Sequence, residues 1–244
     1  MIRRSTMALA LIVATSCGTP VENASQQLIE QVRLGDPLAQ QTYDENLEIL
    51  ESAEALPIWV AALANDDSGQ VKQWAAQIIG NIADASALPA LAAAMSDSRG
   101  VRDAAVAAIR QFDDAAAAGA FTQALAEGSR DAKVTALSQL SRLETGAEAA
   151  VGAIAASAAS SDALVARTSI DTLSDIANDE ACAAIGGIAT NARLDAEMRA
   201  YAVSALGRIQ TDASAAQIDA VVAALQDADD DTAAELLTQA RSLR

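Results

Sequence analysis

The chain has 244 residues, of which 52% are hydrophobic and only 2% aromatic, and its formal net charge is −17. An interior of Ala, Leu, Ile and Val, the high helix propensity of Ala, and the lack of any run in which apolar and polar residues alternate favour an all-α protein and argue against strands. The negative charge disfavours nucleic acid and anionic lipid surfaces as partners, because both would repel it.

Residues 1–16 have the pattern of a bacterial signal peptide. Arg3 and Arg4 precede an apolar run from Met7 to Val13, and this run is about half of the ~20 residues that a membrane-spanning helix needs. The four residues Ala14–Cys17 resemble the lipobox of bacterial lipoproteins, in which the cysteine takes a diacylglyceryl group and becomes the new N-terminus. We therefore expect lipidation of Cys17; a plain secretory signal and an ordinary buried N-terminal helix are the alternatives.

The residue after the cysteine bears on where the protein is sorted. Gly18, rather than Asp, fits sorting to the outer membrane in bacteria that use that rule. We expect an exported protein that is lipid-anchored to the bacterial membrane through Cys17, in the outer membrane and facing the periplasm.

Residues 17–23 are expected to be the lipidated cysteine and a short linker, followed by a capping helix pair over residues 24–52. Two amphipathic runs, Ser25–Leu34 and Leu38–Leu50, are separated by Gly-Asp-Pro, which ends one helix and starts the next. The apolar side chains predicted to face inward are Leu28, Val32, Tyr43, Leu47 and Leu50.

Residues 53–244 are predicted to be six repeats of one helical hairpin. The clearest copy is 85–112, whose second helix carries apolar residues at offsets 0, 4, 5, 8 and 11 from Val101. The same stripe recurs from the anchors Val71, Val101, Ala132, Val165, Met198 and Thr232, which are 30, 31, 33, 33 and 34 residues apart. Because one short hairpin cannot bury both apolar faces alone, this period predicts a right-handed α-solenoid of stacked hairpins.

The repeat also resembles a known family. The segments Ala87-Leu88-Pro89-Ala90-Leu91, Asp97 and Val101-Arg102-Asp103-Ala104-Ala105 are similar to HEAT-like repeats of the phycobilisome-lyase type. Residues 74–80 and 201–207 match the closing part of that repeat, including its glycine. The resemblance covers about residues 53–243 and implies the fold rather than a task. Enzymes of this class include bilin lyases and a di-iron hydroxylase whose metal is held by His–Glu pairs.

A basic residue just after each anchor is predicted to pair with an acidic side chain of a neighbouring turn. These residues are Lys72, Arg102, Lys133 and Arg199, with Arg167 one place further on. The turns supply Asp66, Asp67, Asp97, Asp131, Asp162, Asp195 and the run 227–231, which we also expect to cap the helices that follow.

The sequence offers little for catalysis. It has no histidine, the commonest general base and metal ligand, and no nucleophile elbow, phosphate loop or dinucleotide fingerprint. Residues 227–231 alternate carboxylates like the start of a calcium loop, but Thr232 and Thr238 stand where the glycine and the glutamate belong. Cys182 is interpreted as a small buried hydrophobe rather than a reactive thiol. We therefore expect no catalytic, cofactor or metal site, and no enzyme.

The remaining candidate is a surface. Offsets 3, 7 and 10 of the second helices are expected to point away from the core, giving a possible partner surface of Trp74, Gln77, Asn81, Gln111, Arg142, Thr168, Asp175, Tyr201 and Arg208. Trp74 and Tyr201 are either interaction hot spots or covers of seams between repeats.

These observations predict a non-catalytic scaffold that presents an extended surface to a protein partner in the cell envelope. A passive structural or envelope-assembly protein and a chromophore-lyase-like enzyme are the alternatives. No nucleic acid and no small-molecule substrate is expected.

Overall fold

The computed structural model describes residues 18–143, 145–226 and 231–244. Within these ranges the chain forms α-helices and two short 3₁₀ helices, and none of the described residues is in a strand. The elements in chain order are α1 (Pro20–Leu34), α2 (Ala39–Glu45), α3 (Leu47–Leu50), α4 (Leu56–Asn65), α5 (Gly69–Ile82), η1 (Ala85–Ala87), α6 (Leu88–Ala94), α7 (Arg99–Ile109), α8 (Asp114–Glu127), α9 (Arg130–Leu140), η2 (Ala147–Ala150), α10 (Val151–Ser157), α11 (Ala163–Ile176), α12 (Asp179–Thr190), α13 (Ala196–Ile209), α14 (Asp212–Leu225) and α15 (Asp231–Ser242).

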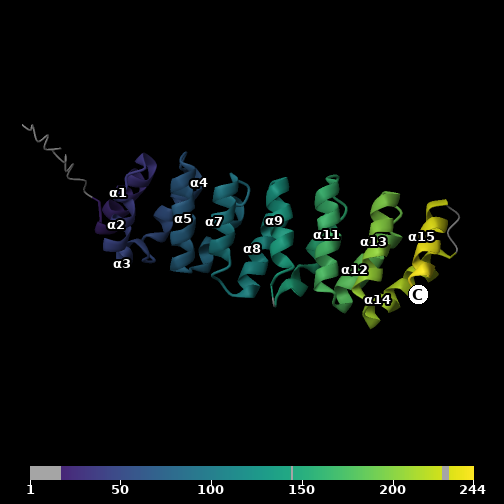
Figure 1. The fold of residues 1–244 in the computed structure, drawn as a ribbon. Coiled ribbons are helices and arrows are strands. Elements are labelled where there is room, and N and C mark those ends of the chain that lie inside the picture. Colours follow the sequence, from purple (N-terminus) through teal and green to yellow (C-terminus); the bar gives the residue numbers. More distant parts are fainter. Residues whose placement is uncertain (1–17, 144, 227–230) are drawn as a thin grey trace, which may run out of the picture.

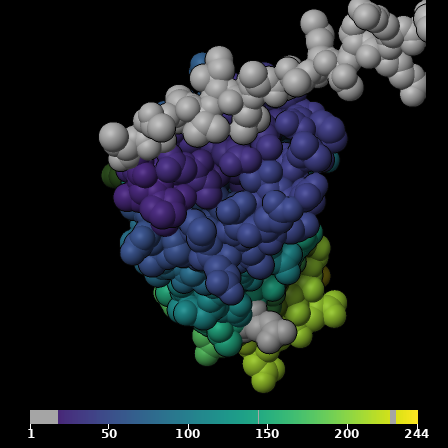
Figure 2. Space-filling view, turned by 90° about the vertical axis from the view of Figure 1, so that its left-hand side faces the viewer, coloured from purple at the N-terminus to yellow at the C-terminus, as the bar shows by residue number. Residues whose placement is uncertain are grey.

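The hairpins stack side by side in a single row, which confirms the predicted all-α solenoid (Figure 1). One layer consists of the first helices α4, α6, α8, α10, α12 and α14, each packed on the next or on its own hairpin partner. The other layer consists of the second helices α5, α7, α9, α11, α13 and α15. Seen from the N-terminal end, the purple and blue residues of the capping helices and of the first hairpin lie in front of the rest (Figure 2).

The apolar stripe of the second helices is buried where it was predicted to be, except at its end and at Val106, Thr232 and Leu237, which are only partly buried. All six residues at offset 4, from Ala75 to Leu236, are buried, and so are all six at offset 8, from Ile79 to Ala240. At offset 11 the side chains are only half-buried, and Leu243 is 38% exposed. The residues at this offset lie at or beyond the last helical turn, so they cover the end of the core instead of filling it.

Seams between repeats are closed by small residues. A Cβ added to Gly80 of α5 would lie 3.0 Å from the Cα of Ala108 in α7, so these two helices meet almost backbone to backbone. Gly207 in α13 lies in the same way against Leu243 at the end of α15. α7 and α9 are the exception, because they approach each other less closely than the other neighbouring second helices do.

The N-terminal capping helices differ from the prediction in three details. α1 begins at Pro20 rather than after a linker that runs to residue 23, because Thr19 caps it with a reciprocal bond pair to Glu22. The second run is broken at Asn46 into α2 and α3. The side chain of Leu47, predicted to face inward, is 42% exposed, because it lies on the outer side of the short α3.

Not every turn acid performs both of the predicted tasks, which are capping the next helix and pairing with a cation. Asp162 and Asp195 do cap α11 and α13 by accepting from backbone N–H groups. The caps of α5 and α9, however, are Ser68 and Ser129, and no side-chain cap bond is formed at the start of α7. The carboxylates of the turns before α5, α7 and α9 accept instead from cations of another repeat or of the capping helices.

In the described ranges, no helix is both long enough and apolar enough to cross a bilayer.

Candidate interaction surface

The outward side of the second helices forms one continuous surface across the six repeats. It is made by offsets 3, 6 and 10 from each anchor, and none of these residues is buried. We call it the second-helix face: Trp74, Gln77, Asn81, Ala104, Ala107, Gln111, Thr135, Ser138, Arg142, Thr168, Asp171, Asp175, Tyr201, Ser204, Arg208, Glu235, Thr238 and Ser242. All the residues that the sequence suggested for a partner surface are therefore at least partly exposed on one side of the stack.

The prediction that side chains at offset 7 point outward is wrong. Ile78, Ala108, Gln139, Thr172 and Ala205 are all buried there. At about 100° per residue, offset 7 lies only about 20° around the helix from the buried anchor. Its side chains therefore enter the seam with the preceding repeat, as Thr172 does when its hydroxyl donates to the carbonyl oxygen of Leu137 at 3.3 Å.

Trp74 and Asn81 meet in a cluster at the N-terminal end of the face. Their partners come from the capping helices: the Tyr43 ring packs edge-on against Trp74 with centroids 5.5 Å apart. The Tyr43 hydroxyl donates to Glu51, and Asn81 Nδ2 donates to Glu51 Oε1 at 2.5 Å and to the Tyr43 hydroxyl at 3.1 Å. Burial, together with the Glu51 carboxylate, raises the pKa of Tyr43 to about 12. Trp74 thus covers a seam while part of its surface stays accessible.

Tyr201 and Arg208 meet in a second cluster at the other end of the face. The Tyr201 hydroxyl donates to Asp171 Oδ1 at 2.8 Å, and Arg208 pairs with the same carboxylate at 3.0 Å. The guanidinium carbons of Arg167 and Arg208 lie 5.5 Å and 5.3 Å from the centre of the Tyr201 ring. Burial and the Asp171 carboxylate raise the pKa of Tyr201. These contacts hold the phenol in one orientation across the seam between α11 and α13.

Between the two clusters the face is mostly uncharged. Gln77 is exposed, and the Gln111 side chain lies over the backbone of Gly80. Asp175 is exposed near the end of α11. Sequence reasoning did not find Tyr43, Glu51 or Asp171 as members of the clusters, because their pairings join residues 30 or more positions apart or cross from the capping helices.

Arg142 lines a small cleft beyond the ends of α7 and α9. The space measures about 210 Å³. Its lining residues are Arg110, Phe112, Asp114, Ala117, Gln139, Arg142 and Leu143. The sequence indicated Arg142 alone, since Arg110 and Gln139 fall at register positions where most other repeats have small or apolar residues.

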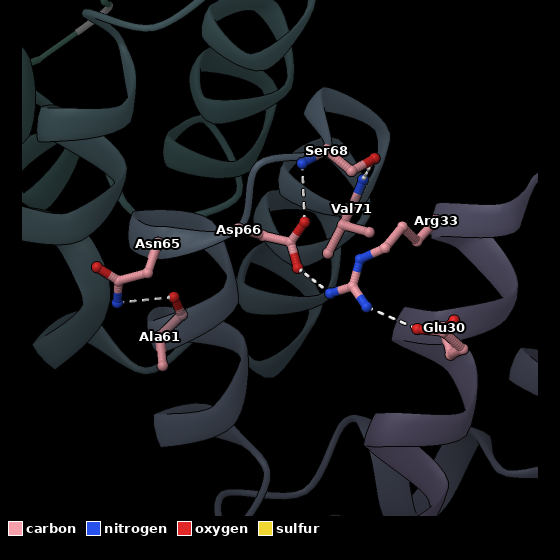
Figure 3. Close-up of polar contacts among 7 residues, drawn as sticks. All are labelled: Glu30, Arg33, Ala61, Asn65, Asp66, Ser68 and Val71. Atoms are coloured by element: carbon pink, nitrogen blue, oxygen red, sulfur yellow. Dashed lines mark hydrogen bonds and ion pairs between the residues drawn. The ribbon is translucent and has the colours of Figure 1, made fainter.

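A line of ion pairs runs between repeats on the turn side of the stack. It begins between α1 and the turn before α5, where Arg33 Nη2 contacts Asp66 Oδ2 at 2.6 Å and Arg33 Nη1 contacts Glu30 (Figure 3). Burial acts to raise the pKa of Asp66, but the hydrogen bond from the Ser68 N–H and the Arg33 guanidinium together outweigh it and lower that pKa. This first pair was not predicted, because Arg33 lies outside the regular repeats.

Two of the five predicted pairs are formed with the expected acids: Lys72 contacts Asp97 at 2.6 Å, and Arg102 contacts Asp131 at 3.4 Å. Arg167 pairs with Glu197 in the first turn of α13 rather than with Asp195, which caps that helix.

The other two predicted pairs are wrong. Asp162 pairs with Arg130 at 2.6 Å, which leaves Lys133 without an acidic partner among the described residues. Arg199 is buried and donates through Nε to the carbonyl oxygen of Ala189 at 3.2 Å. In both repeats a nearer or better aligned group takes the place of the partner that register alone suggested.

Other chemistry is sparse in the part of the chain that the structure describes. Cys182 is buried, as predicted, and burial raises the pKa of its thiol. No group of three or more Cys, Asp or Glu side chains in these ranges is placed to hold a metal ion. The predicted lipidation site Cys17, and residues 227–230 of the carboxylate run, lie outside the described residues.

Comparison with known proteins identifies the repeat. Residues 56–141 match the sequence family described as HEAT repeats. No curated protein matches the sequence. The solved structures that resemble the chain include human deoxyhypusine hydroxylase in complex with glycerol, with 20% identity, a TM-score of 0.40, and coverage of 91% of this chain and 95% of that one. They also include the complex of CpcE and CpcF of phycocyanin lyase from Nostoc sp. PCC7120, with 17% identity, a TM-score of 0.38, and coverage of 95% and 97%.

These two structures correct one expectation. Both belong to proteins named as enzymes, so the prediction that the chain is not an enzyme is contradicted and we withdraw it. At these TM-scores neither likeness assigns an activity to this chain. Residues 56–141 match the family described as HEAT repeats, and the helical hairpins on both sides of them extend the same α-solenoid.

Proposed function

We propose that this protein is a HEAT-repeat scaffold that binds a protein partner through the second-helix face. The observation that carries the proposal is the charge of that face. The eight residues of the face from Trp74 to Ser138, which belong to the first three of the six repeats, carry no charge, whereas 20% of the residues of the whole chain are charged. Depletion of charge is a feature of the cores of protein interfaces, because a charged side chain loses hydration when a partner covers it.

The two aromatic clusters support the same role. Trp74 and Tyr201 are both half-exposed, and each is held by neighbours on an adjacent element. An aromatic side chain that is already fixed loses little conformational entropy on binding, which is why such residues are frequent among binding hot spots. The face therefore offers two preorganised anchors that are separated by amide and hydroxyl groups.

We also propose that the scaffold acts in the cell envelope, tethered by a lipid on Cys17. The support is the sequence pattern of residues 1–18. Several acyl chains on one residue would anchor the protein stably, since one chain alone gives only marginal binding.

The partner proposal is tested by crosslinking in cells that make the full-length protein, followed by purification and identification of the stoichiometric partner. The double variant Gln77→Arg/Gln111→Arg places two bulky charges on exposed positions of α5 and just after α7, in the uncharged part of the face. We expect it to recover the partner at least about tenfold less efficiently, because each charge would have to be desolvated in the complex.

The matched control is Gln26→Arg/Gln27→Arg, which adds the same charges to exposed positions of α1 outside the face. It should recover the partner as the wild type does, and both variants should keep the wild-type urea midpoint. Equal recovery by the face variant, or absence of any stoichiometric partner, would overturn the proposal; the second result would favour a passive structural protein.

The anchor is tested with Cys17→Ser and metabolic labelling with a radioactive fatty acid. The wild type should incorporate label into the membrane fraction, and the variant should incorporate none, because serine has no thiol to acylate. Cys182→Ser is the control, since that thiol is buried, and it should leave labelling intact. Unchanged labelling of Cys17→Ser would refute the lipid anchor.

A further inference from the structure

The cleft beyond the ends of α7 and α9 has features that the partner surface alone does not explain. These are the two shortest second helices, with 11 residues each against 12 to 14 in the others. They also approach each other less closely than their neighbours do. Because both end early and stand apart, a space of about 210 Å³ remains between Arg110, Gln139 and Arg142.

The largely buried residue Gln139 has no hydrogen-bond partner for its side chain among the described residues. Only 8% of the residue is exposed, and its side chain makes no hydrogen bond with any described residue. Polar residues at the same offset behave differently elsewhere: Thr172 donates to the Leu137 carbonyl, and Gln239 donates to the Ala200 carbonyl and to the Ser204 hydroxyl, always on the preceding second helix. The Gln139 side chain instead lines the cleft, where its amide makes no hydrogen bond with a described residue and can donate to a ligand.

Two arginines line the same cleft. Within the described ranges neither Arg110 nor Arg142 has an ion-pair partner, although most other cations of the repeats are paired. The acid in the lining, Asp114, accepts from the N–H and the hydroxyl of Thr145 at 2.9 and 3.3 Å. The lining therefore carries two guanidinium groups and one carboxylate that is already engaged, a net charge of +1 in a chain of net charge −17.

We propose that this cleft binds a single carboxylate of the protein partner, and this rests on the proposed function above. Guanidinium groups recognise planar oxyanions through paired N–H donors, and the amide of Gln139 supplies a further donor. A carboxylate balances the lining charge of +1, whereas a phosphate monoester with about −1.5 to −2 charges would exceed it next to Asp114. The space is smaller than the roughly 300–1,000 Å³ of typical small-molecule pockets, which fits one side chain or one chain end.

Phe112 and Leu143 add an apolar rim to the cleft. They would cover the aliphatic part of an acidic side chain while its carboxylate reaches the arginines. The cleft opens next to Gln111 and includes Arg142 of the second-helix face. A partner lying across the middle of the face can therefore insert an acidic residue here without leaving the surface.

The test uses the full chain labelled with ¹⁵N and small carboxylates in place of the partner. N-acetyl-glutamate amide presents one side-chain carboxylate, N-acetyl-alanine presents one chain-end carboxylate, and N-acetyl-glutamine amide is the uncharged control. We expect saturable shifts of the Arg110 and Arg142 Nε–H signals and of the Gln139 amide with at least one of the two acids. The acid that binds more tightly identifies the kind of carboxylate.

Variants locate the site. Arg142→Gln and Arg110→Gln should each weaken binding of the acid by at least about tenfold, the loss expected when a charged hydrogen bond is removed. Arg241→Gln removes another exposed arginine, at the end of α15, that has no ion pair with a described residue, and it should leave binding unchanged.

Three outcomes would overturn the proposal: equal shifts with N-acetyl-glutamine amide, binding that Arg110→Gln and Arg142→Gln do not weaken, or inorganic phosphate that binds more than tenfold tighter than either acid. Because no partner protein is present in this test, its failure leaves the crosslinking result untouched. Failure to find a partner by crosslinking likewise leaves this binding measurement intact.

Discussion

Single residues at the helix ends decide where the chain can reverse direction. Gly35 ends α1 with φ of +66°, and its N–H and that of Asp36 bond back to the carbonyls of Val32 and Gln31. Three other residues, Ala83, Ala177 and Gln210, take a positive φ at the ends of α5, α11 and α13 although they carry a Cβ. A left-handed conformation is strained in a residue with a Cβ, and glycine is the residue that adopts it without that cost.

Gly35→Ala should lower the free energy of unfolding by about 1 kcal/mol, because a Cβ in the left-handed region is strained even where space is open. Gly119→Ala is the matched control: Gly119 is exposed inside α8, has no positive φ, and a Cβ there meets open space. It should raise stability by about 0.5–1 kcal/mol. Urea unfolding followed by circular dichroism measures both, and a loss of stability in the control would contradict the conformational explanation.

The carboxylate of Asp97 links stability to pH. The hydrogen bond from Lys72 and that from the Ser98 N–H hold the pKa of Asp97 below its ordinary value. A lowered folded-state pKa stabilises the fold at pH values above about 4, and this contribution is lost as pH falls through the folded-state pKa.

Asp97→Asn should therefore cost about 1 kcal/mol at pH 7 and progressively less below about pH 4. Urea midpoints measured from pH 7 down to pH 3 test this. Asp103→Asn serves as the control, since Asp103 and its partner Arg99 are both highly exposed and 3.7 Å apart. A cost for Asp97→Asn that stays constant with pH would rule out the proposed linkage.

At the scale of the helix, the period of the sequence decides which side is buried. Offsets 4 and 8 were correctly predicted in all six repeats, because they depend only on the turn of one helix. Offset 7 was wrongly predicted, because whether a position at the edge of the stripe is buried depends on how closely the next helix packs. The pair of α5 and α7, which meet at Gly80, shows how close that packing becomes.

Ile109 in α7 is completely buried at offset 8. Ile109→Ala should cost about 2–5 kcal/mol, since it removes apolar contacts and leaves a cavity in a central repeat. Ala107→Ser, on the exposed side of the same helix, should stay within about 0.5 kcal/mol of the wild type. Denaturant unfolding measures both, and a cost below about 1 kcal/mol for Ile109→Ala would mean that the seam relaxes to fill the space.

At the scale of the whole molecule, charge opposes compactness. The net charge of −17 repels itself throughout the stack, while the ion pairs between repeats are mostly surface pairs worth about 0–1 kcal/mol each. Added salt screens both the repulsion and the ion pairs, so the larger of these two effects decides whether stability rises or falls with salt.

We expect that raising sodium chloride from low concentration to about 0.5 M increases the melting temperature by about 2–4 °C, the shift that 1 kcal/mol gives in a chain of this size. Choline chloride at the same ionic strength is the control for specific ion effects and should act alike. A fall in melting temperature would show instead that the ion pairs between repeats dominate the electrostatic free energy.

The placement of the candidate surface residues on one side of the stack could be predicted, because it depends on the turn of each helix; that they bind a partner stays a prediction. Trp74, Asn81, Tyr201 and Arg208 could be assigned to one side of the second helices from their offsets. That Asn81 bonds to Glu51, and that Tyr201 and Arg208 share the Asp171 carboxylate, could not be predicted, because Glu51 and Asp171 lie on other elements. The cleft was also missed, since it depends on the distance between α7 and α9.

The sequence by itself determined the helical hairpins, their spacing of 30 to 34 residues and the buried stripe. Helical periodicity is a local property of the sequence, and the same apolar pattern recurs in each repeat. Only the tertiary structure decided that Arg130 rather than Lys133 pairs with Asp162, and that Gln139 is left unpartnered between two arginines. Those outcomes depend on competition among neighbouring side chains and on separations between helices. Such distances are set by packing between residues of different repeats, so no single segment of the sequence determines them.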